Sequence, residues 1–207
     1  GSLYNNKPSG SLGMIGCFSA HPLKNLNAIG DAGYLTTNSN KIYRQVIELR
    51  NHGMVDRNKI KRFGHVSRMD NLQAAVLNYR LKNLKKVITN RRKNVELYNK
   101  YLDHKNVFIP AEKKYQFNSY HTFVIQVDKR DQLKRYLQSN NITTAVHYPI
   151  PIHLQPYYKK KFGFKKGDFP IAEKFYEQEV SLPIYFSLKK EKIVEIIKNI
   201  KFFCKIK

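Results

Sequence analysis

The sequence predicts an α/β protein in which short strands alternate with amphipathic helices. Two short apolar runs near the start of the chain are typical of buried strands. Apolar residues then recur every three or four positions from Leu77 to Leu102, which predicts a long helix. After that helix, residues 107–207 combine a strand-like alternation with several helical patterns, as expected for a smaller α+β unit.

The first part of the chain predicts two strands, a helix and a loop. The apolar runs at 14–18 and 33–37 have the length of buried strands, and Lys24 lies between them. Residues 40–51 carry apolar side chains at helical spacing. Residues 53–64 are expected to form a basic loop.

The long helix is predicted over residues 70–102, with Asp70 as its start signal and Asp103 after its end. Its apolar positions are Leu77, Leu81, Leu84, Ile88, Val95, Tyr98 and Leu102. The chain therefore divides into residues 1–68, a connecting helix within 69–106, and a small unit at 107–207.

The small unit is expected to contain two strands and three helices. Alternation predicts one strand at 120–127, and a second strand is expected at 143–147. Helices are expected at 131–140, at 171–179 and at the end of the chain, where Ile193, Ile196, Ile197, Ile200 and Phe203 share one face.

The composition is typical of a folded protein. It favours neither nucleic acid nor a membrane as a partner. The 207 residues are 42% hydrophobic and carry a formal net charge of +23. Lysine is spread along the whole chain, so the charge does not gather into a patch for nucleic acid. No apolar run approaches the roughly 20 residues of a membrane span. Two widely separated cysteines indicate neither a disulfide framework nor a zinc site, which fits a reducing cytoplasm.

Lys24 is the candidate catalytic residue. It follows the apolar run that ends in Ser19, and Pro22 and the glycines of Gly30-Asp31-Ala32-Gly33 keep its segment tight. An amine held by packed structure can lose its proton and attack a carbonyl carbon. On spacing alone, a solvated lysine near a strand end is the simpler interpretation.

A succession of short motifs favours the chemical interpretation. They are, in order, Gly10-Ser11-Leu12-Gly13-Met14-Ile15-Gly16-Cys17-Phe18-Ser19, His21-Pro22-Leu23-Lys24-Asn25-Leu26, Gly30-Asp31-Ala32-Gly33, Arg50-Asn51-His52-Gly53, Ser67-Arg68-Met69-Asp70, Gln73-Ala74-Ala75, Ser119-Tyr120-His121, His147-Tyr148-Pro149, His153-Leu154-Gln155-Pro156 and Ser181-Leu182-Pro183. In this order they resemble the DegT/DnrJ/EryC1/StrS family of sugar aminotransferases, which use pyridoxal 5′-phosphate (PLP) and have the aspartate aminotransferase fold. The resemblance covers nearly the whole chain.

The resemblance implies a PLP-dependent transferase of fold type I. Residues 1–68 would be the C-terminal part of the PLP-binding large domain, and 107–207 the small C-terminal domain. The family lysine at the Lys24 position links covalently to PLP, and the serine at the Ser19 position bonds the phosphate. Asn25 is expected to contact the cofactor as well. Family chains are much longer, so this chain is expected to be a C-terminal fragment that lacks much of the cofactor site.

The resemblance also implies the substrates and partners. We expect an amino group to pass, with glutamate as donor, to a nucleotide-linked keto-deoxyhexose for surface-polysaccharide or other amino-sugar biosynthesis. The expected assembly is a homodimer or a complex with the missing N-terminal half. Val66 departs from the family pattern, because many members carry there an asparagine that reaches the partner subunit's phosphate.

The expected substrate-binding residues are polar side chains in the proline-stiffened segment 146–156 together with one arginine. They are His147, Tyr148, His153, Gln155 and Arg50. Proline lowers the entropy lost when such a loop is ordered. No metal site is expected at the two histidines, because no Cys, Asp or Glu is near them in sequence.

There are three alternative functions. Family members that use pyridoxamine phosphate (PMP) to dehydrate the sugar carry histidine at the lysine position, so Lys24 argues against that reaction. A catalytically incomplete fragment with an interaction or structural role is consistent with the missing half. A basic regulator that binds nucleic acid would need a helix-turn-helix or RNA-binding signature, and the sequence shows neither.

Overall fold

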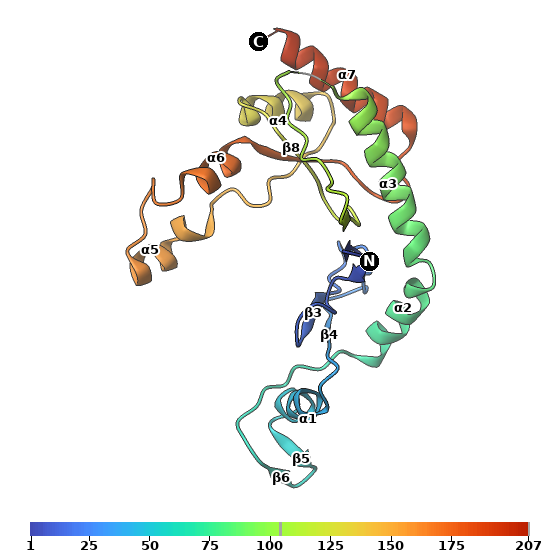
Figure 1. Ribbon diagram of the computed structural model, residues 1–207, viewed down its shortest axis with the longest axis vertical. Coiled ribbons are helices and arrows are strands. Elements are labelled where there is room, and N and C mark those ends of the chain that lie inside the picture. The colour runs from blue at the N-terminus through green and yellow to red at the C-terminus, as the bar shows by residue number, and fades with distance from the viewer. Residues whose placement is uncertain (104, 207) are drawn as a thin grey trace. The chain divides into compact units, whose positions relative to one another are not determined.

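The computed structural model describes residues 1–103 and 105–206 (Figure 1), and the chain forms two compact units. Unit 1 comprises Gly1–Ile88 and Glu112–Ser119, and unit 2 comprises Thr89–Ala111 and Tyr120–Lys207. Among the described residues, no helix has the length and apolar content needed to cross a bilayer.

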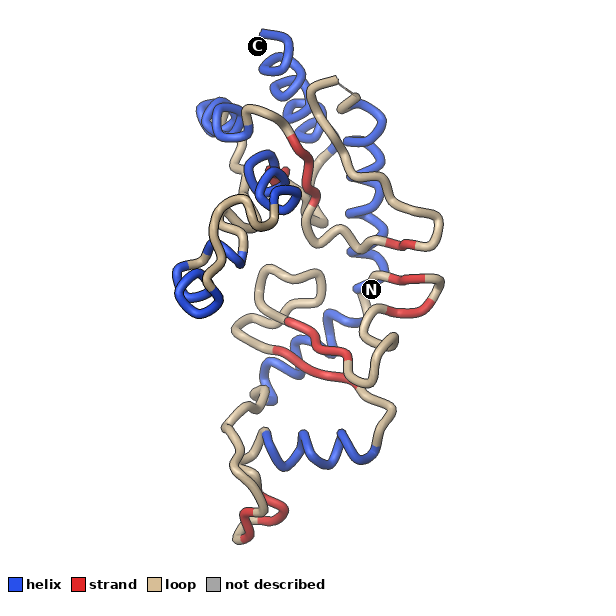
Figure 2. The backbone as a smooth tube through the Cα atoms, turned by 60° about the vertical axis from the view of Figure 1, so that its left-hand side comes forward, coloured by secondary structure: helices blue, strands red, loops and turns tan. Residues whose placement is uncertain are grey.

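The two strands predicted around Lys24 are present. β3 (Gly16–Ser19) pairs antiparallel with β4 (Gly33–Thr36) (Figure 2). In the register of this pair, Ser19 lies opposite Gly33. A side chain at Gly16 would place its Cβ 2.2 Å from the carbonyl oxygen of Gly10, so only glycine fits where β3 begins.

The remaining strands of unit 1 were not predicted. β1 (Leu3–Tyr4) lies between β2 (Lys7–Pro8) and β7 (Gln116–Phe117), and both neighbours are antiparallel to it. The expected basic loop contains a hairpin of β5 (Met54–Asp56) and β6 (Lys59–Ile60). Such short pairs are held by partners distant in sequence or by turns, which apolar spacing does not reveal.

The prediction of one long helix over 70–102 was wrong. α1 (Asn40–Leu49) is present as expected, but α2 (Asn71–Leu81) and α3 (Leu84–Tyr101) are separate helices. The Asn83 N–H donates to the Arg80 carbonyl (3.0 Å), which tightens the end of α2. The Asn83 carbonyl then accepts the first bond of α3. Asparagine favours helix ends because its side chain competes for backbone hydrogen bonds.

Unit 2 is built on one antiparallel pair, β8 (Phe123–Gln126) with β9 (Glu179–Leu182). Its helices are α4 (Arg130–Ser139), the short turn η1 (Ile152–Leu154), α5 (Pro156–Phe162), α6 (Pro170–Gln178) and α7 (Lys190–Ile206). The predicted strand at 120–127 and the helices at 131–140, 171–179 and the chain end are confirmed. β9, η1 and α5 were missed.

The predicted strand at 143–147 was wrong. Of those residues only Ala145 makes a strand-like bridge, to Ser181 of β9. The chain leaves the sheet after this pair.

The core of unit 2 lies between the sheet and its helices. Its fully buried members include Val95, Tyr98, Leu102, Ile125, Leu133, Leu137, Val180, Ile193 and Ile200. Burying each of these large apolar side chains contributes about 1.5–3 kcal/mol. Unit 1 has only a small buried cluster of Ala20, Ala28 and Leu77.

Candidate functional site

Lys24 lies in a tight turn directly after β3. Its backbone N–H donates to the His21 carbonyl (2.8 Å), and the Leu23 N–H donates to Nδ1 of His21 (3.2 Å). The Asn27 side-chain amide closes the turn on the carbonyl of Pro22 (2.6 Å). The Lys24 residue is half-buried. These bonds fix the backbone from which the amine extends, as a positioned nucleophile requires.

Two buried alanines close the base of this loop. The Ala20 N–H donates to the Ala32 carbonyl, and the Ala28 N–H donates to the Ala20 carbonyl, both at 2.8 Å. Ala20 and Ala28 are at most 1% exposed and pack with Leu77 of α2. The loop therefore rests on α2.

Two polar side chains of α2 bind the backbone of residues 27–30, which follow Lys24 in the loop. Oε1 of Gln73 accepts the backbone N–H groups of residues 29 and 30, at 2.9 and 3.2 Å. Nη1 of Arg80 donates to the carbonyls of residues 27 and 28, at 2.8 and 3.1 Å. α2 thus binds both donors and acceptors of the loop that carries Lys24.

Ser19 and Asn25 lie on either side of Lys24 in sequence and belong to the same loop region. Ser19 is exposed at the end of β3, and its hydroxyl accepts the His21 N–H at 3.4 Å. Nδ2 of Asn25 donates to the Ser119 carbonyl (2.9 Å), whereas its Oδ1 is buried and has no hydrogen-bond partner among the described residues. A buried acceptor without a donor is costly, so this atom is suited to a ligand that brings one.

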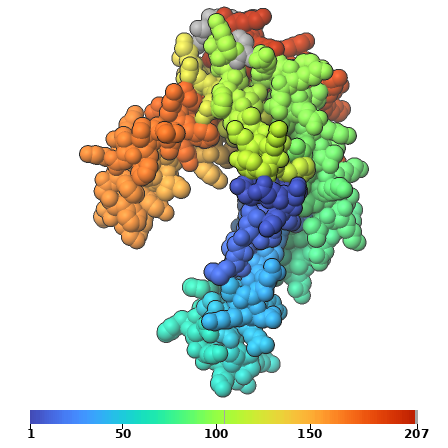
Figure 3. All heavy atoms as spheres, viewed as in Figure 1, coloured from blue at the N-terminus to red at the C-terminus, as the bar shows by residue number. Residues whose placement is uncertain are grey.

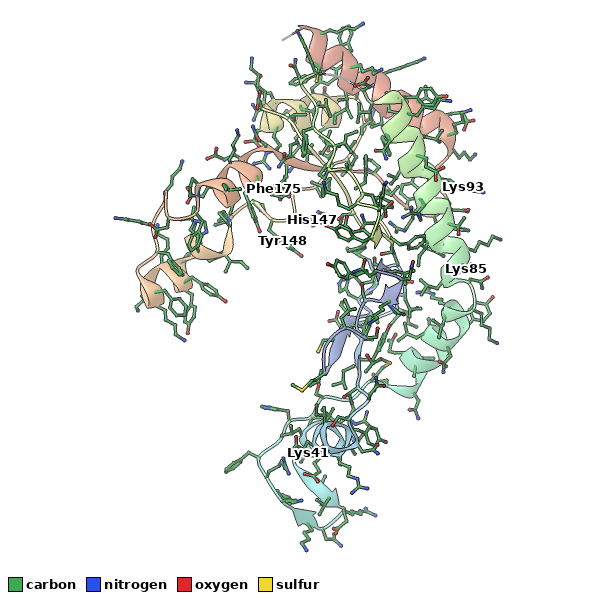
Figure 4. The ribbon with its side chains drawn as sticks, in the orientation of Figure 1. Lys41, Lys85, Lys93, His147, Tyr148 and Phe175 are labelled. Carbon is green, nitrogen blue, oxygen red and sulfur yellow. The ribbon has the colours of Figure 1, made fainter. Side chains whose placement is uncertain are left out.

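His147 and Tyr148 lie side by side in unit 2, on the segment before α5 (Figure 4). Nδ1 of His147 is 2.8 Å from Oγ of Ser181. The His147 and Tyr148 rings meet edge to face, with centroids 5.6 Å apart. Tyr148 is 64% exposed and His147 is also exposed, so both side chains are available to a ligand.

His153 is buried instead of presented to solvent. Its Nε2 is 2.9 Å from Oε1 of Glu173, and both residues are less than a tenth exposed. The Glu173 carboxylate also accepts the N–H of Gly167 at 2.9 Å and that of Phe169 at 3.3 Å. The hydrogen bonds from His153 and from these two amides keep the pKa of Glu173 below its ordinary value, although burial acts in the opposite direction.

The bond to Glu173 of α6 holds His153 in its buried position. The segment that contains α5 and α6 forms the orange lobe in Figure 3. The Phe169 ring packs against the His153 ring at a centroid distance of 4.8 Å. Nearby, Nε2 of Gln155 donates to the Ile150 carbonyl at 3.4 Å. In this structure His153 and Gln155 brace their own segment, a role that the sequence analysis did not anticipate.

Arg50 lies at the C-terminal end of α1 and is exposed. Its backbone carbonyl accepts the Ser67 N–H at 2.9 Å. Val66, at the position where the family pattern has asparagine, is 62% exposed and bridges Asn51. Neither residue belongs to the loop that brings Ser19, Lys24 and Asn25 together.

Several residues of the site were missed as functional. Gln73 and Ser181 belong to two of the sequence motifs, but the motifs did not indicate what these two side chains do. Arg80 and Glu173 gave no signal, because their partners lie far along the chain. Among the described residues, no group of three or more His, Cys, Asp or Glu side chains is arranged to hold a metal ion.

A known protein family matches this chain over almost its whole length. The model of the DegT/DnrJ/EryC1/StrS aminotransferase family matches residues 1–201. The family depends on PLP. The Streptococcus pneumoniae protein Spr1654, a putative sugar aminotransferase that has been solved in a PLP form and a PMP form, matches at 25% identity with TM-scores of 0.89 and 0.90. These two matches cover 98% of this chain and 54% of that one.

Individual relatives agree with this match. A pleiotropic regulatory protein of Geobacillus stearothermophilus is 34% identical over 98% of this chain and 55% of its own length. A UDP-N-acetyl-3-dehydro-alpha-D-glucosamine 3-aminotransferase of Acidithiobacillus ferrooxidans is 34% identical over 95% of this chain and 52% of its own length. The structure of Streptomyces venezuelae DesV matches with a TM-score of 0.93 and 30% identity, over 98% of this chain and 55% of that chain. The chain spans about half the length of the curated relatives it matches.

Proposed function

Because this chain belongs to the DegT/DnrJ/EryC1/StrS aminotransferase family, we propose that it carries the catalytic lysine of a nucleotide-sugar aminotransferase. The complete enzyme means here this chain together with the part of the relatives that it does not cover. It transfers an amino group from an amino-acid donor, glutamate, to the keto carbon of a nucleotide-linked deoxyhexose. The observation that carries the proposal is Lys24 in a loop fixed by α2, next to Asn25 with its unpartnered acceptor.

The residues of this loop fit PLP. The cofactor, when bound, supplies an electron sink for the charge left on carbon when a proton is removed. Nζ of Lys24 is the primary amine that binds an aldehyde carbon covalently. The Ser19 hydroxyl, exposed at the end of β3, can donate to a phosphate oxygen. Oδ1 of Asn25 can accept an N–H or O–H from the bound group.

Lys24 also supplies the proton transfer. With the cofactor bound, the Lys24 amine would be the base, attached to a fixed backbone, that carries a proton between the Cα of the amino donor and C4′ of the cofactor. Its position is set by the bonds within the turn and by the Gln73 and Arg80 contacts from α2. A histidine at this position could form no such covalent link, because an imidazole is not a primary amine.

The substrate is a nucleotide sugar in this proposal, as the names of relatives suggest. Those names include a UDP-linked 3-keto sugar and a dTDP-linked amino sugar. In this chain, the exposed His147 and Tyr148 are suited to the sugar and pyrophosphate, because a phenol and an imidazole both donate hydrogen bonds to oxygen. A reducing compartment such as the cytoplasm suits Cys17 and Cys204, which are free thiols.

Partners are expected for unit 1. Several large apolar side chains of this unit are more than 60% exposed: Met14, Leu23, Ile60, Phe63, Val66, Leu72 and Tyr79. Exposed apolar surface of this extent usually marks an interface. We expect the remaining part of the complete enzyme, or a second copy of it, to cover these side chains. If no such partner covers these apolar side chains, we expect the chain to have only an interaction or structural role.

Amino transfer from isotope-labelled glutamate tests the proposal. The complete enzyme is incubated with PLP, [¹⁵N]glutamate and either a UDP-linked or a dTDP-linked keto-deoxyhexose, and the sugar product is analysed by mass spectrometry. We expect the label in the sugar of one of the two nucleotide classes. Loss of a hydroxyl from the sugar without gain of nitrogen would instead favour the PMP-dependent dehydration. No change in either sugar would contradict the proposal.

A further inference from the structure

β9 presents two polar side chains on the face opposite the core. Val180 and Leu182 are core residues of unit 2, and the alternation of a strand places Glu179 and Ser181 on the other face. Both polar residues are nevertheless buried, at 1% and 6% exposure. A buried carboxylate and hydroxyl side by side need a structural or functional reason.

The chain segment next to β9 makes a single strand-like pair. Ser181 and Ala145 exchange both backbone hydrogen bonds, at 2.8 and 3.1 Å. In antiparallel register the next pair would be His147 with Glu179, two residues further along each segment. That pair does not form through the backbone.

Where the His147–Glu179 backbone pair would form, hydrogen bonds from side chains replace it. Nη1 of Arg130 donates to the Glu179 carbonyl at 3.0 Å, which occupies the acceptor that a continued strand would use. The His147 backbone N–H donates to the Glu179 carboxylate instead. The segment at 143–147 therefore leaves the sheet at His147, and this residue is turned out of the strand while still being held.

His147 is thus held at two points from the same strand. Glu179 accepts its backbone N–H, and Oγ of Ser181 is 2.8 Å from its ring Nδ1. If the serine hydroxyl donates to Nδ1, the ring proton resides on Nε2, which can then donate to a ligand. Two contacts, one to the backbone and one to the ring, define both the place and the rotation of the imidazole.

A buried carboxylate such as Glu179 is a costly hydrogen-bond acceptor for the His147 backbone N–H, because its burial lowers the stability of the fold. Its Oε1 is buried with no hydrogen-bond partner among the described residues. Burial raises the pKa of Glu179, and the Arg130 charge and the His147 N–H only partly oppose this effect. An uncharged side chain would be less costly for stability alone.

We propose that Glu179 and Ser181 are positioning residues that hold His147 so that its Nε2 donates to the phosphate oxygens of a nucleotide-linked sugar. This inference rests on the proposed function, since it assigns the orientation of one substrate-binding residue. Neither residue is expected to touch the substrate. Their effect passes through His147.

Substrate affinity tests the role of Ser181. The complete enzyme is titrated calorimetrically with UDP-N-acetylglucosamine and with dTDP-glucose, which have no keto group, so binding is measured without turnover. Whichever of the two binds the unmodified enzyme should bind Ser181→Ala about fivefold to tenfold more weakly, as loss of one oriented hydrogen bond predicts. Ser181→Thr retains the hydroxyl and should recover most of the affinity. Ser187→Ala, at an exposed serine after β9, is the matched control and should bind normally.

Hydrogen exchange tests the role of Glu179 in the same protein. Glu179→Gln keeps an acceptor for the His147 N–H and should preserve its protection from exchange, whereas Glu179→Leu should lose it. Equal affinity of Ser181→Ala and unmodified enzyme, absence of binding in both included, would overturn the proposal. Weaker binding that Ser181→Thr does not recover would overturn it as well. A Ser181-dependent affinity in an enzyme that transfers no amino group would keep this inference and refute the proposed function.

Discussion

Nε2 of His153 lies 2.9 Å from Oε1 of Glu173, and both residues are less than a tenth exposed. The pair joins η1 to α6 across the whole α5 segment, and the same carboxylate accepts backbone N–H groups at Gly167 and Phe169. One carboxylate therefore ties η1 and the loop at residues 167–169 to α6. The two histidines of the proline-rich segment consequently have different roles, since His147 is exposed and His153 is buried.

The first prediction concerns the pH dependence of this pair. The folded-state pKa of Glu173 is lowered, so its ionised form stabilises the fold above the unfolded-state pKa. That stability is lost as the pH falls through the lowered folded-state value. Glu173→Gln should therefore be less stable than the unmodified chain at neutral pH, and the difference should shrink in acid. Urea unfolding at a series of pH values measures it.

Glu177→Gln is the control for this prediction, because Glu177 is exposed on the same helix and forms a 3.6 Å ion pair with Lys166 at the surface. Its stability should stay close to that of the unmodified chain at every pH. A Glu173→Gln variant that matched the unmodified chain at neutral pH would contradict the role given to the pair.

The second prediction concerns Arg91 in the core of unit 2. Its Nη1 donates to the carbonyls of Tyr120 (3.0 Å), His121 (3.2 Å) and Ile184 (2.9 Å). Burial lowers the pKa of this guanidinium, but the bonds to three carbonyls hold it in place. Arg91→Met should lower the free energy of unfolding by about 3 kcal/mol, because buried acceptors lose their donor.

Lys93→Met tests whether the loss is specific to that position. Lys93 is exposed on the same helix (Figure 4), and its replacement should change the unfolding free energy by no more than about 0.5 kcal/mol. Chemical denaturation measures the unfolding free energy of both variants. Equal stabilities would show that the three carbonyls find other donors.

The third prediction concerns the loop of Lys24. Gln73→Ala removes the acceptor for the N–H groups of Ile29 and Gly30, so these two amides should exchange with solvent faster. The free energy of unfolding of unit 1 should fall by about 1–2 kcal/mol. Asn78→Ala, at an exposed position of α2, should leave the exchange unchanged. Unchanged exchange in Gln73→Ala would mean that α2 does not hold the loop.

The fourth prediction concerns the 207-residue chain by itself. Unit 1 exposes many large apolar side chains and buries only a small cluster, so the isolated chain should associate. It should also bind PLP weakly, since Lys24, Ser19 and Asn25 fix only part of such a ligand. Light scattering measures the mass in solution, and a titration followed by absorbance measures PLP binding. A monomer that binds PLP tightly would contradict the prediction.

Apolar spacing predicted the local elements well. β3, β4, α1, β8, α4, α6 and α7 were each expected near their observed positions, because a buried face leaves a period in the sequence. The break between α2 and α3 was missed, since the apolar period continues through Lys82 and Asn83 while the backbone turns. The false strand at 143–147 has an analogous origin, because its pairing ends where Arg130 and Glu179 side chains replace backbone partners.

The sequence motifs identified part of the candidate site. Lys24, Ser19 and Asn25 do share one loop region of unit 1. The sequence could not tell that His153 would bond Glu173, because a histidine and a carboxylate 20 positions apart show no pattern. Nor could it show that Gln73 and Arg80 would clamp the loop, because their partners are backbone atoms.

Replacement of Lys24 tests the central claim most directly. In the complete enzyme, Lys24→Ala should lower the rate of amino transfer by at least 10²–10⁴-fold, because one amine is both the covalent link and the proton carrier. Lys41→Ala, at an exposed lysine of α1 (Figure 4), should transfer amino groups at the normal rate. Borohydride reduction in the presence of PLP should attach the cofactor to the peptide that contains Lys24, and should attach none there in Lys24→Ala. Near-normal turnover by Lys24→Ala, or a cofactor trapped on another lysine, would contradict the account.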